Sequence, residues 1–195
     1  MKTSVSQSPD QALQLHRRAL LGFGAACAIS LVSGRALAAG DLGKAMDHAK
    51  RLSFHNLHTG EKLRTEFWAQ GKFIPEALSQ INHILRDHRT NEVSRIDPAL
   101  LGLLHALQCK VETGAAFHVI SGYRSAASNA KLRAQSGGVA NRSLHMRGQA
   151  IDIAIPGCGL ADLRRAAISL RAGGVGYYPA SGFVHVDTGR VRQWS

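Results

Sequence analysis

The sequence predicts an α+β domain in which a small antiparallel sheet packs against several helices. Helical periodicity dominates residues 75–107, whereas short alternating segments bounded by glycine and proline dominate residues 149–187. This separation of helices and strands along the chain is typical of the α+β class. The 195 residues are about enough for one domain, and no internal repeat or low-complexity segment interrupts them.

The first strands and helices are expected from residue 52 onward. Residues 52–68 alternate apolar and polar side chains around Thr59-Gly60, which predicts a β-hairpin. A 3.6-residue apolar stripe over 75–88 predicts a helix that begins at a proline, and the leucines of 98–107 predict a second helix after a capping aspartate. The segment 40–51 is short and polar, and we expect it to form a helix that leads into the first strand.

The second half of the chain predicts short strands between short helices. Further strands are expected over 117–121 and 149–155, and two more within 173–189 on either side of Pro179–Gly182; helices are expected over 126–134 and 160–171.

Residues 1–38 have the pattern of an export signal. The Arg17–Arg18 pair precedes an uncharged run over 19–33, and a small-x-small sequence follows at 36–38. The run is shorter than the about 20 residues that a membrane span needs. The pair resembles a twin-arginine (Tat) signal, with an ordinary secretory signal as the alternative. We therefore expect residues 39–195 to form a periplasmic domain with no stable membrane span.

Strand alternation also separates polar from apolar side chains in two segments. In QAIDI (149–153) Asp152 faces away from the isoleucines, and in FVHVD (183–187) His185 faces away from the valines. If these strands pair antiparallel, Asp152 and His185 become cross-strand neighbours. His145 lies in the turn before the first strand and would reach both.

Two imidazoles and one carboxylate form a ligand set that suits Zn²⁺. Three protein ligands leave a fourth position for water, which is the arrangement of catalytic sites, and a metal there favours amide hydrolysis. A histidine and an aspartate seven residues apart are weak evidence alone, and an ordinary histidine is the alternative. Five other histidines are expected at the surface or in structural roles: His55, His58, His83, His88 and His105.

Three motifs together resemble the zinc peptidases of the LAS group, which includes the D-Ala-D-Ala metallopeptidases and the hedgehog fold. They are SGYRS at 121–125, S-x-H-x-x-G-x-A-x-D at 143–152, and a late histidine on a strand. The segments LSFHNLHTGEKL and GGVGYYPASGFVHVDTGRVRQW are similar to the MepK/YcbK-type murein endopeptidases, periplasmic proteins that often use the Tat route. The likeness runs from about Leu52 to Trp194.

The resemblance implies one zinc ion per chain, held by His145, Asp152 and His185. Arg124 matches an arginine that in relatives binds the substrate carboxylate or the developing oxyanion, and a planar guanidinium suits either role. A structural ion pair is the alternative for Arg124. Ser143 matches the motif serine and is expected to contact the substrate or support a ligand.

The expected catalytic base departs from the family pattern. Several relatives carry Glu-x-x-His or His-x-His before the last ligand, but Gly182 and Phe183 stand at those positions here. Asp187 is the nearest usable carboxylate, on the same face as His185. We expect it either to act as the base or to orient His185.

Two further groups near the end of the chain are candidates for the cleft wall. Tyr177 and Tyr178 are both able to line it; we expect Tyr178 to contact the substrate and one tyrosine to be buried. Arg190, Arg192 and Trp194 form a basic and aromatic tail that would either touch glycan or pack on the sheet as a strand end.

The charge balance favours an anionic partner. Removal of residues 1–38 would leave 20 basic and 12 acidic residues, a formal charge of +8, which attracts anions over a distance. The anionic cell wall fits an exported protein better than nucleic acid does, and plain solubility is the alternative. Cys109 and Cys158 could form a disulfide in an oxidising compartment or remain two free thiols.

These observations lead us to expect a monomeric, exported zinc endopeptidase that hydrolyses the peptide cross-links of peptidoglycan in cell wall remodelling, with no nucleic acid partner. A second hypothesis is a zinc-stabilised, non-catalytic peptidoglycan-binding module of the same fold, which the missing base would explain. A third is a wall-anchoring protein without a metal. The sequence does not distinguish D,D-amides from L,D-amides as the substrate.

Overall fold

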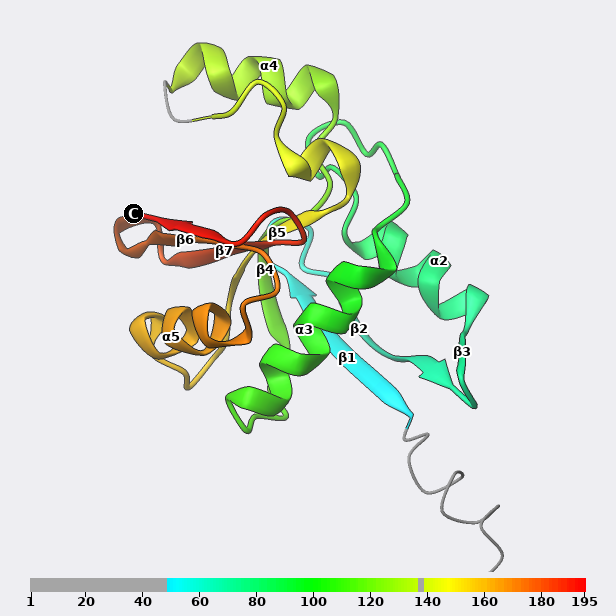
Figure 1. Cartoon of the computed structure of the whole chain (residues 1–195). Coiled ribbons are helices and arrows are strands. Elements are labelled where there is room, and N and C mark those ends of the chain that lie inside the picture. The colour runs from blue at the N-terminus through cyan, green and yellow to red at the C-terminus, as the bar shows by residue number, and fades with distance from the viewer. Residues whose placement is uncertain (1–48, 137–138) are drawn as a thin grey trace, which may run out of the picture. The chain divides into compact units, whose positions relative to one another are not determined.

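The computed structural model describes residues 49–136 and 139–195, which form one eight-stranded sheet with helices packed against it (Figure 1). The order of the strands across the sheet is β3-β2-β1-β4-β5-β7-β6-β8. The strands are β1 (Lys50–Asn56), β2 (Lys62–Ala69), β3 (Lys72–Phe73), β4 (Phe117–Ser121), β5 (Ala150–Ala154), β6 (Gly174–Tyr178), β7 (Phe183–Asp187) and β8 (Arg192–Trp194). The helices are α2 (Pro75–Ile84), α3 (Pro98–Lys110), α4 (Ala126–Gln135) and α5 (Leu160–Leu170), with 3₁₀ turns η1 (Leu144–Arg147) and η2 (Pro179–Ser181).

The α+β class is confirmed, and the sheet is larger than expected. Its extra strands, β3 and β8, have two and three residues, too few to show a period of two in the sequence. The sheet is also mixed, because β1 pairs with β4, and β6 with β8, in parallel. The hairpin is confirmed as β1 and β2, but residues 50 and 51 belong to β1 rather than to a helical lead-in. Residues 40–48 lie outside the described residues.

Two helix starts are fixed by side chains that accept backbone hydrogen bonds. The Asp97 carboxylate accepts from the Ala99 amide at the start of α3, as the capping sequence predicts. The Ser125 hydroxyl accepts from the Ser128 amide at the start of α4, which leaves Arg124 just outside the helix. The first predicted helix, α2, ends at Ile84 rather than at residue 88.

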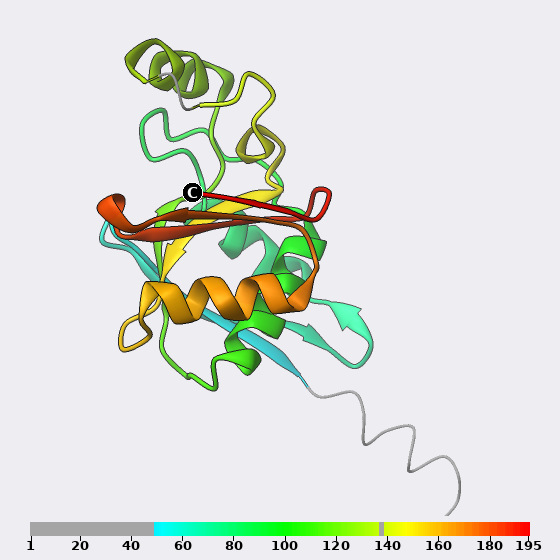
Figure 2. The ribbon, with the colours of Figure 1, turned by 60° about the vertical axis from the view of Figure 1, so that its left-hand side comes forward.

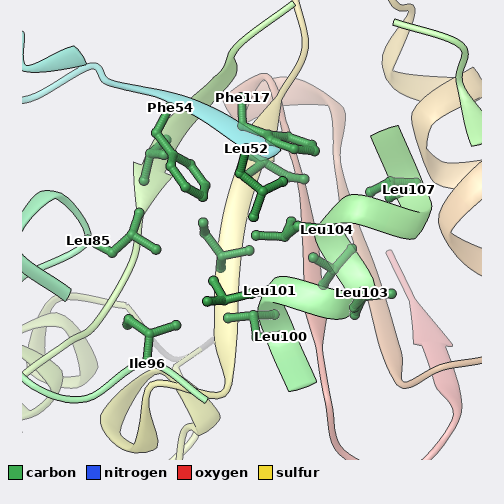
Figure 3. Packing of buried hydrophobic residues seen from close by; sticks show 14 of the residues in the cluster. Leu52, Phe54, Leu85, Ile96, Leu100, Leu101, Leu103, Leu104, Leu107 and Phe117 are labelled. Carbon is green, nitrogen blue, oxygen red and sulfur yellow. The ribbon is translucent and has the colours of Figure 1, made fainter. Parts of the chain in front are cut away.

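The hydrophobic core lies between one face of the sheet and the helices α2, α3 and α5. Figure 3 shows Leu104 of α3 beside Leu52 of β1, in a cluster that also contains Leu100, Leu101 and Phe117 of β4; all five are at most 1% exposed. In Figure 2, α5 lies on one side of β6 and β7, and α4 lies on the other side. Because the core helices cover the opposite face, the sheet face toward α4 can carry polar side chains.

Among residues 49–136 and 139–195, no helix combines the length and the apolar character needed to span a bilayer. The predicted signal at 1–38 lies outside these ranges, so export and the division of the chain at residue 38 stay predictions.

Candidate metal centre

Three predicted ligand residues meet on the polar face of the sheet. Asp152 on β5 and His185 on β7 are direct cross-strand partners, as the alternation predicts. His145 comes from η1, which Gly148 ends in the left-handed conformation. All three residues are buried, with 3%, 5% and 9% exposure for His145, Asp152 and His185.

Hydrogen bonds determine which imidazole nitrogens face the centre. His145 Nδ1 lies 2.7 Å from the Gly122 carbonyl oxygen, which can only accept, so Nδ1 donates and Nε2 of the neutral ring keeps its lone pair. His185 Nε2 lies 3.1 Å from an Asp187 carboxylate oxygen. By the same reasoning, Nε2 donates and Nδ1 of His185 keeps its lone pair.

The three free atoms converge on one point. His145 Nε2 lies 3.3 Å from Asp152 Oδ1 and 3.2 Å from His185 Nδ1, and His185 Nδ1 lies 2.8 Å from Asp152 Oδ1. A tetrahedral zinc site with bonds of about 2.0–2.1 Å separates its ligand atoms by about 3.3 Å. The donor set and its spacing therefore fit Zn²⁺.

The centre also attracts positive charge. Burial alone would lower the pKa of His185, but hydrogen bonds and charges from Asp152 and Asp187 outweigh it and raise the pKa. Burial opposes ionisation of Asp152, yet the two neighbouring imidazoles lower its pKa. Three acceptors facing one another need a proton or a cation between them, and a metal ion meets that need.

Asp187 is surrounded by donors. It is fully buried, and its Oδ1 accepts from the amides of Gly174 and Gly189 at 3.0 and 2.8 Å and from Arg192 at 3.1 Å. Its Oδ2 accepts from Arg192 at 2.7 Å and from His185 at 3.1 Å. Despite burial, these hydrogen bonds lower the pKa of Asp187. Of the two roles predicted for it, the geometry favours orienting His185 over proton transfer.

The tail of the chain packs on the sheet as β8 and places Trp194 next to the metal-centre residue His185. Gly176 pairs with His185 on one side and with Trp194 on the other. A Cβ on Gly176 would lie 2.7 Å from ring atoms of Trp194, so glycine is needed there. Trp194 lies 5.2 Å from the His185 ring and donates to the Tyr178 hydroxyl at 2.8 Å. Packing of the tail as a strand end is one of the two alternatives that the sequence left open, but nothing in the sequence placed Trp194 beside His185.

Arg124 lies beside the centre and is weakly paired. Its Nη2 is 3.7 Å from Asp152 Oδ2 and 3.4 Å from the Ser121 hydroxyl, and its buried Nε has no hydrogen-bond partner. Burial lowers the pKa of Arg124, while the Asp152 charge opposes that effect. Such contacts fall short of a bidentate ion pair, so the guanidinium has capacity for another anion.

These groups line one cleft of about 710 Å³ above the polar face. Arg124, Ser143 and Tyr178 all line it, as predicted for substrate contacts, whereas Tyr177 packs against the core. His58 was expected at the surface and is exposed, but it also lines the cleft, where its ring stacks on that of His88 at 3.8 Å. This position could not be inferred from sequence spacing.

The two cysteines of the described residues are separate free thiols, which decides the alternative left open by the sequence. Cys109 is exposed on α3.

A buried His-Asp-His centre at the floor of a cleft is the kind of site that zinc peptidases use. A family model described as peptidoglycan L,D-endopeptidase MepK matches residues 44–194. The chain is 50% identical over 143 residues to the peptidoglycan L,D-endopeptidase MepK of Escherichia coli, covering 73% of this chain and 79% of the relative. It is 47% identical over 144 residues to the probable peptidoglycan L,D-endopeptidase MepK of Haemophilus influenzae, covering 73% and 77%. The chain therefore belongs to the MepK family of LAS-type metallopeptidases.

Proposed function

We propose that this protein is an exported, zinc-dependent peptidoglycan L,D-endopeptidase that hydrolyses amide bonds in stem-peptide cross-links during cell wall remodelling. The observation that carries this proposal is the convergence of three acceptor atoms, from His145, Asp152 and His185, on the floor of a cleft. Membership of the MepK family supports the L,D-amide as the bond that is cut.

His145 Nε2, Asp152 Oδ1 and His185 Nδ1 would hold the zinc ion. When bound, zinc supplies the Lewis acidity that polarises an amide carbonyl and activates water. Asp187 accepts a hydrogen bond from the Nε2–H group of His185 and so keeps Nδ1 directed at the metal. Arg192 holds the Asp187 carboxylate with two hydrogen bonds, of 2.7 and 3.1 Å.

Two cleft residues would act on the substrate. Arg124 binds an anionic group of the peptide or the charge that develops on the carbonyl oxygen, because its guanidinium is only weakly paired within the protein. The Tyr178 hydroxyl accepts from Trp194, which leaves its own proton free to donate to the substrate. Ser143 lines the same cleft and adds a hydroxyl that makes no capping hydrogen bond.

Location and charge are consistent with this substrate. Peptidoglycan lies outside the cytoplasm, and the pattern of residues 1–38 supports export, with the Tat route as our proposal. The net positive charge of the remaining chain would attract an anionic wall. We propose that the protein acts as a monomer.

The test is digestion of purified sacculi by the mature protein, with products identified by mass. We expect products of L,D-amide hydrolysis, no products after chelation, and recovery when zinc is restored. Intact sacculi with a fully zinc-loaded protein would contradict the proposal.

One observation favours a second candidate, a zinc-stabilised binding module without catalysis. Among the described residues lining the cleft, Asp152 and Asp187 are the only carboxylates, and both are engaged in the metal centre. A module of this kind would retain zinc and bind sacculi without releasing products, so the same digestion separates the two candidates.

A further inference from the structure

The loop between α2 and α3 (residues 85–97) brings Arg89 to the cleft, which Arg124, Arg142 and Arg192 also line. Arg89 is exposed and lines the cleft together with Arg124 and His58. Arg89 takes part in none of the ion pairs found within residues 49–136 and 139–195. Its guanidinium is therefore available to a ligand.

A buried carboxylate fixes the backbone beside Arg89 and Arg124. Asp87, 1% exposed, accepts from the Arg89 amide at 2.9 Å. Its other oxygen accepts from the amide and hydroxyl of Ser125, the residue after Arg124, at 2.9 and 2.7 Å. Because these hydrogen bonds occupy Asp87, it anchors both segments without forming an ion pair with either guanidinium.

A second contact joins the same two segments. The Tyr123 amide donates to the Leu85 carbonyl at 2.7 Å, and a Cβ on Gly122 would lie 2.4 Å from that carbonyl oxygen. Gly122 in turn accepts from the metal-centre residue His145. The loop that carries Arg89 is thus connected to the metal centre through Tyr123, Gly122 and the His145 ring.

Arg89 and Arg124 repel each other in the free protein. Besides burial, the charge of Arg89 lowers the pKa of Arg124, against the opposing effect of Asp152. An anion bound between the two guanidinium groups would remove this repulsion. The cleft's own carboxylates are held in the metal centre, so that anion has to come with the ligand.

We propose that Arg89 is a specificity-determining residue, which together with Arg124 binds carboxylate groups of the stem peptide and so selects peptides with free carboxylates over their amidated forms. This inference rests on the proposed function. Amidation keeps the size of the group and removes its charge, so discrimination between the two forms reports the arginine contact directly.

The experiment measures binding of two non-cleavable product peptides by calorimetry. One is a stem tetrapeptide whose diamino acid carries a free side-chain carboxylate, and the other is its amide. We expect the zinc-loaded wild type to bind the acid about tenfold more tightly, a typical effect of one charge-assisted contact. Arg89→Gln should bring the ratio close to one, and Arg89→Lys should keep part of it. Arg64→Gln, a change at an exposed arginine on β2, is the control and should leave the ratio unchanged.

Sacculus hydrolysis by the same preparations separates the two claims. An acid-to-amide ratio that Arg89→Gln removes supports the inference whether or not the wild type cuts sacculi. A ratio that Arg89→Gln leaves intact, or an equal loss of affinity for both peptides, overturns the inference even in an active enzyme. Zinc content equal to that of the wild type shows that the variant is folded.

Discussion

Strands β5 and β7 present two faces of opposite character. One face places two isoleucines and two valines, each at most 1% exposed, in the core. The other face, from the same backbone segments, carries Asp152, His185 and Asp187, with the His185 ring hydrogen-bonded to Asp187 and its Nδ1 2.8 Å from Asp152 Oδ1. Because side chains alternate along a strand, ten residues serve both stability and chemistry.

The two faces differ in how strongly their roles, stability on one and metal binding on the other, depend on any single side-chain atom. In the core, each side chain makes many weak contacts, so a small deletion costs little and the loss is shared. On the polar face, each of His145, Asp152 and His185 contributes one atom to the metal centre, and no neighbouring side chain can take its position. We therefore expect graded effects from changes on the apolar face and large effects from changes on the polar face.

The largest effect is expected from loss of a ligand. His145→Ala should reduce hydrolysis of sacculi below detection and release the zinc, because two remaining ligands hold the ion too weakly. Metal content and product release are measured together. The control is His83→Ala, a change at an exposed histidine on α2, which should behave as the wild type does. Equal activity in the two variants would refute the ligand assignment.

The next effect concerns Arg124, which would act on the substrate and not on the metal. Arg124→Ala should lower kcat/KM by about 10²–10³-fold, the usual cost of removing one donor to developing charge, while zinc content stays at one per chain. Arg124→Lys should fall between, because an ammonium keeps the charge and loses the planar fork. Loss of zinc from Arg124→Ala would instead point to a structural role.

A variant of Asp187 can distinguish its two candidate roles, which are orientation of His185 and proton transfer. If it orients His185, Asp187→Asn should weaken zinc binding by about 10–100-fold, and excess zinc should restore most of the turnover. If it is the base, turnover should stay low at saturating zinc. A zinc titration of activity in wild type and variant decides between the two roles, and we expect restoration.

The apolar face should respond mildly. Ile151→Val removes one buried methylene next to Asp152 and should lower the free energy of unfolding by about 0.5–1.5 kcal/mol. Activity per zinc-loaded molecule should be unchanged, as measured below the unfolding transition. A large loss of activity in this variant would show that the two faces are not independent.

The last effect depends on pH and is expected at His88, in the loop that carries Arg89. Burial, with the charge of Arg89, lowers the pKa of His88 from 6.5 to about 4, so the folded state disfavours its protonation. Its contribution to stability is therefore complete above pH 6.5 and is lost as the pH falls toward 4. Denaturant unfolding in chelator should show a flatter pH dependence for His88→Gln than for the wild type. Identical slopes would contradict this assignment.

The sequence predicted those parts of the site that depend on local periodicity. The facing of Asp152 and His185 follows from the alternation of two short strands, and one antiparallel pairing then makes them neighbours. The same reasoning identified the hairpin β1–β2 and the capped start of α3. In each case, neighbouring residues in the chain determine the feature.

The rest depends on the path of the chain in space. The contact of Trp194 with His185 requires a three-residue strand that pairs in parallel beside a glycine, and no local pattern marks it. Arg89 reaches the cleft because Asp87 binds a segment 38 residues away. Likewise, the Gly174, Gly189 and Arg192 donors around Asp187 were invisible in the sequence, and they favour one of the two roles that the sequence left open for it.

The most direct test of the account is a crystal structure of the mature protein with zinc, recorded with anomalous diffraction at the zinc edge. We predict a single strong peak per chain, bonded to Nε2 of His145, a carboxylate oxygen of Asp152 and Nδ1 of His185. A peak bound elsewhere, or no peak from a protein that still cuts sacculi, would contradict it.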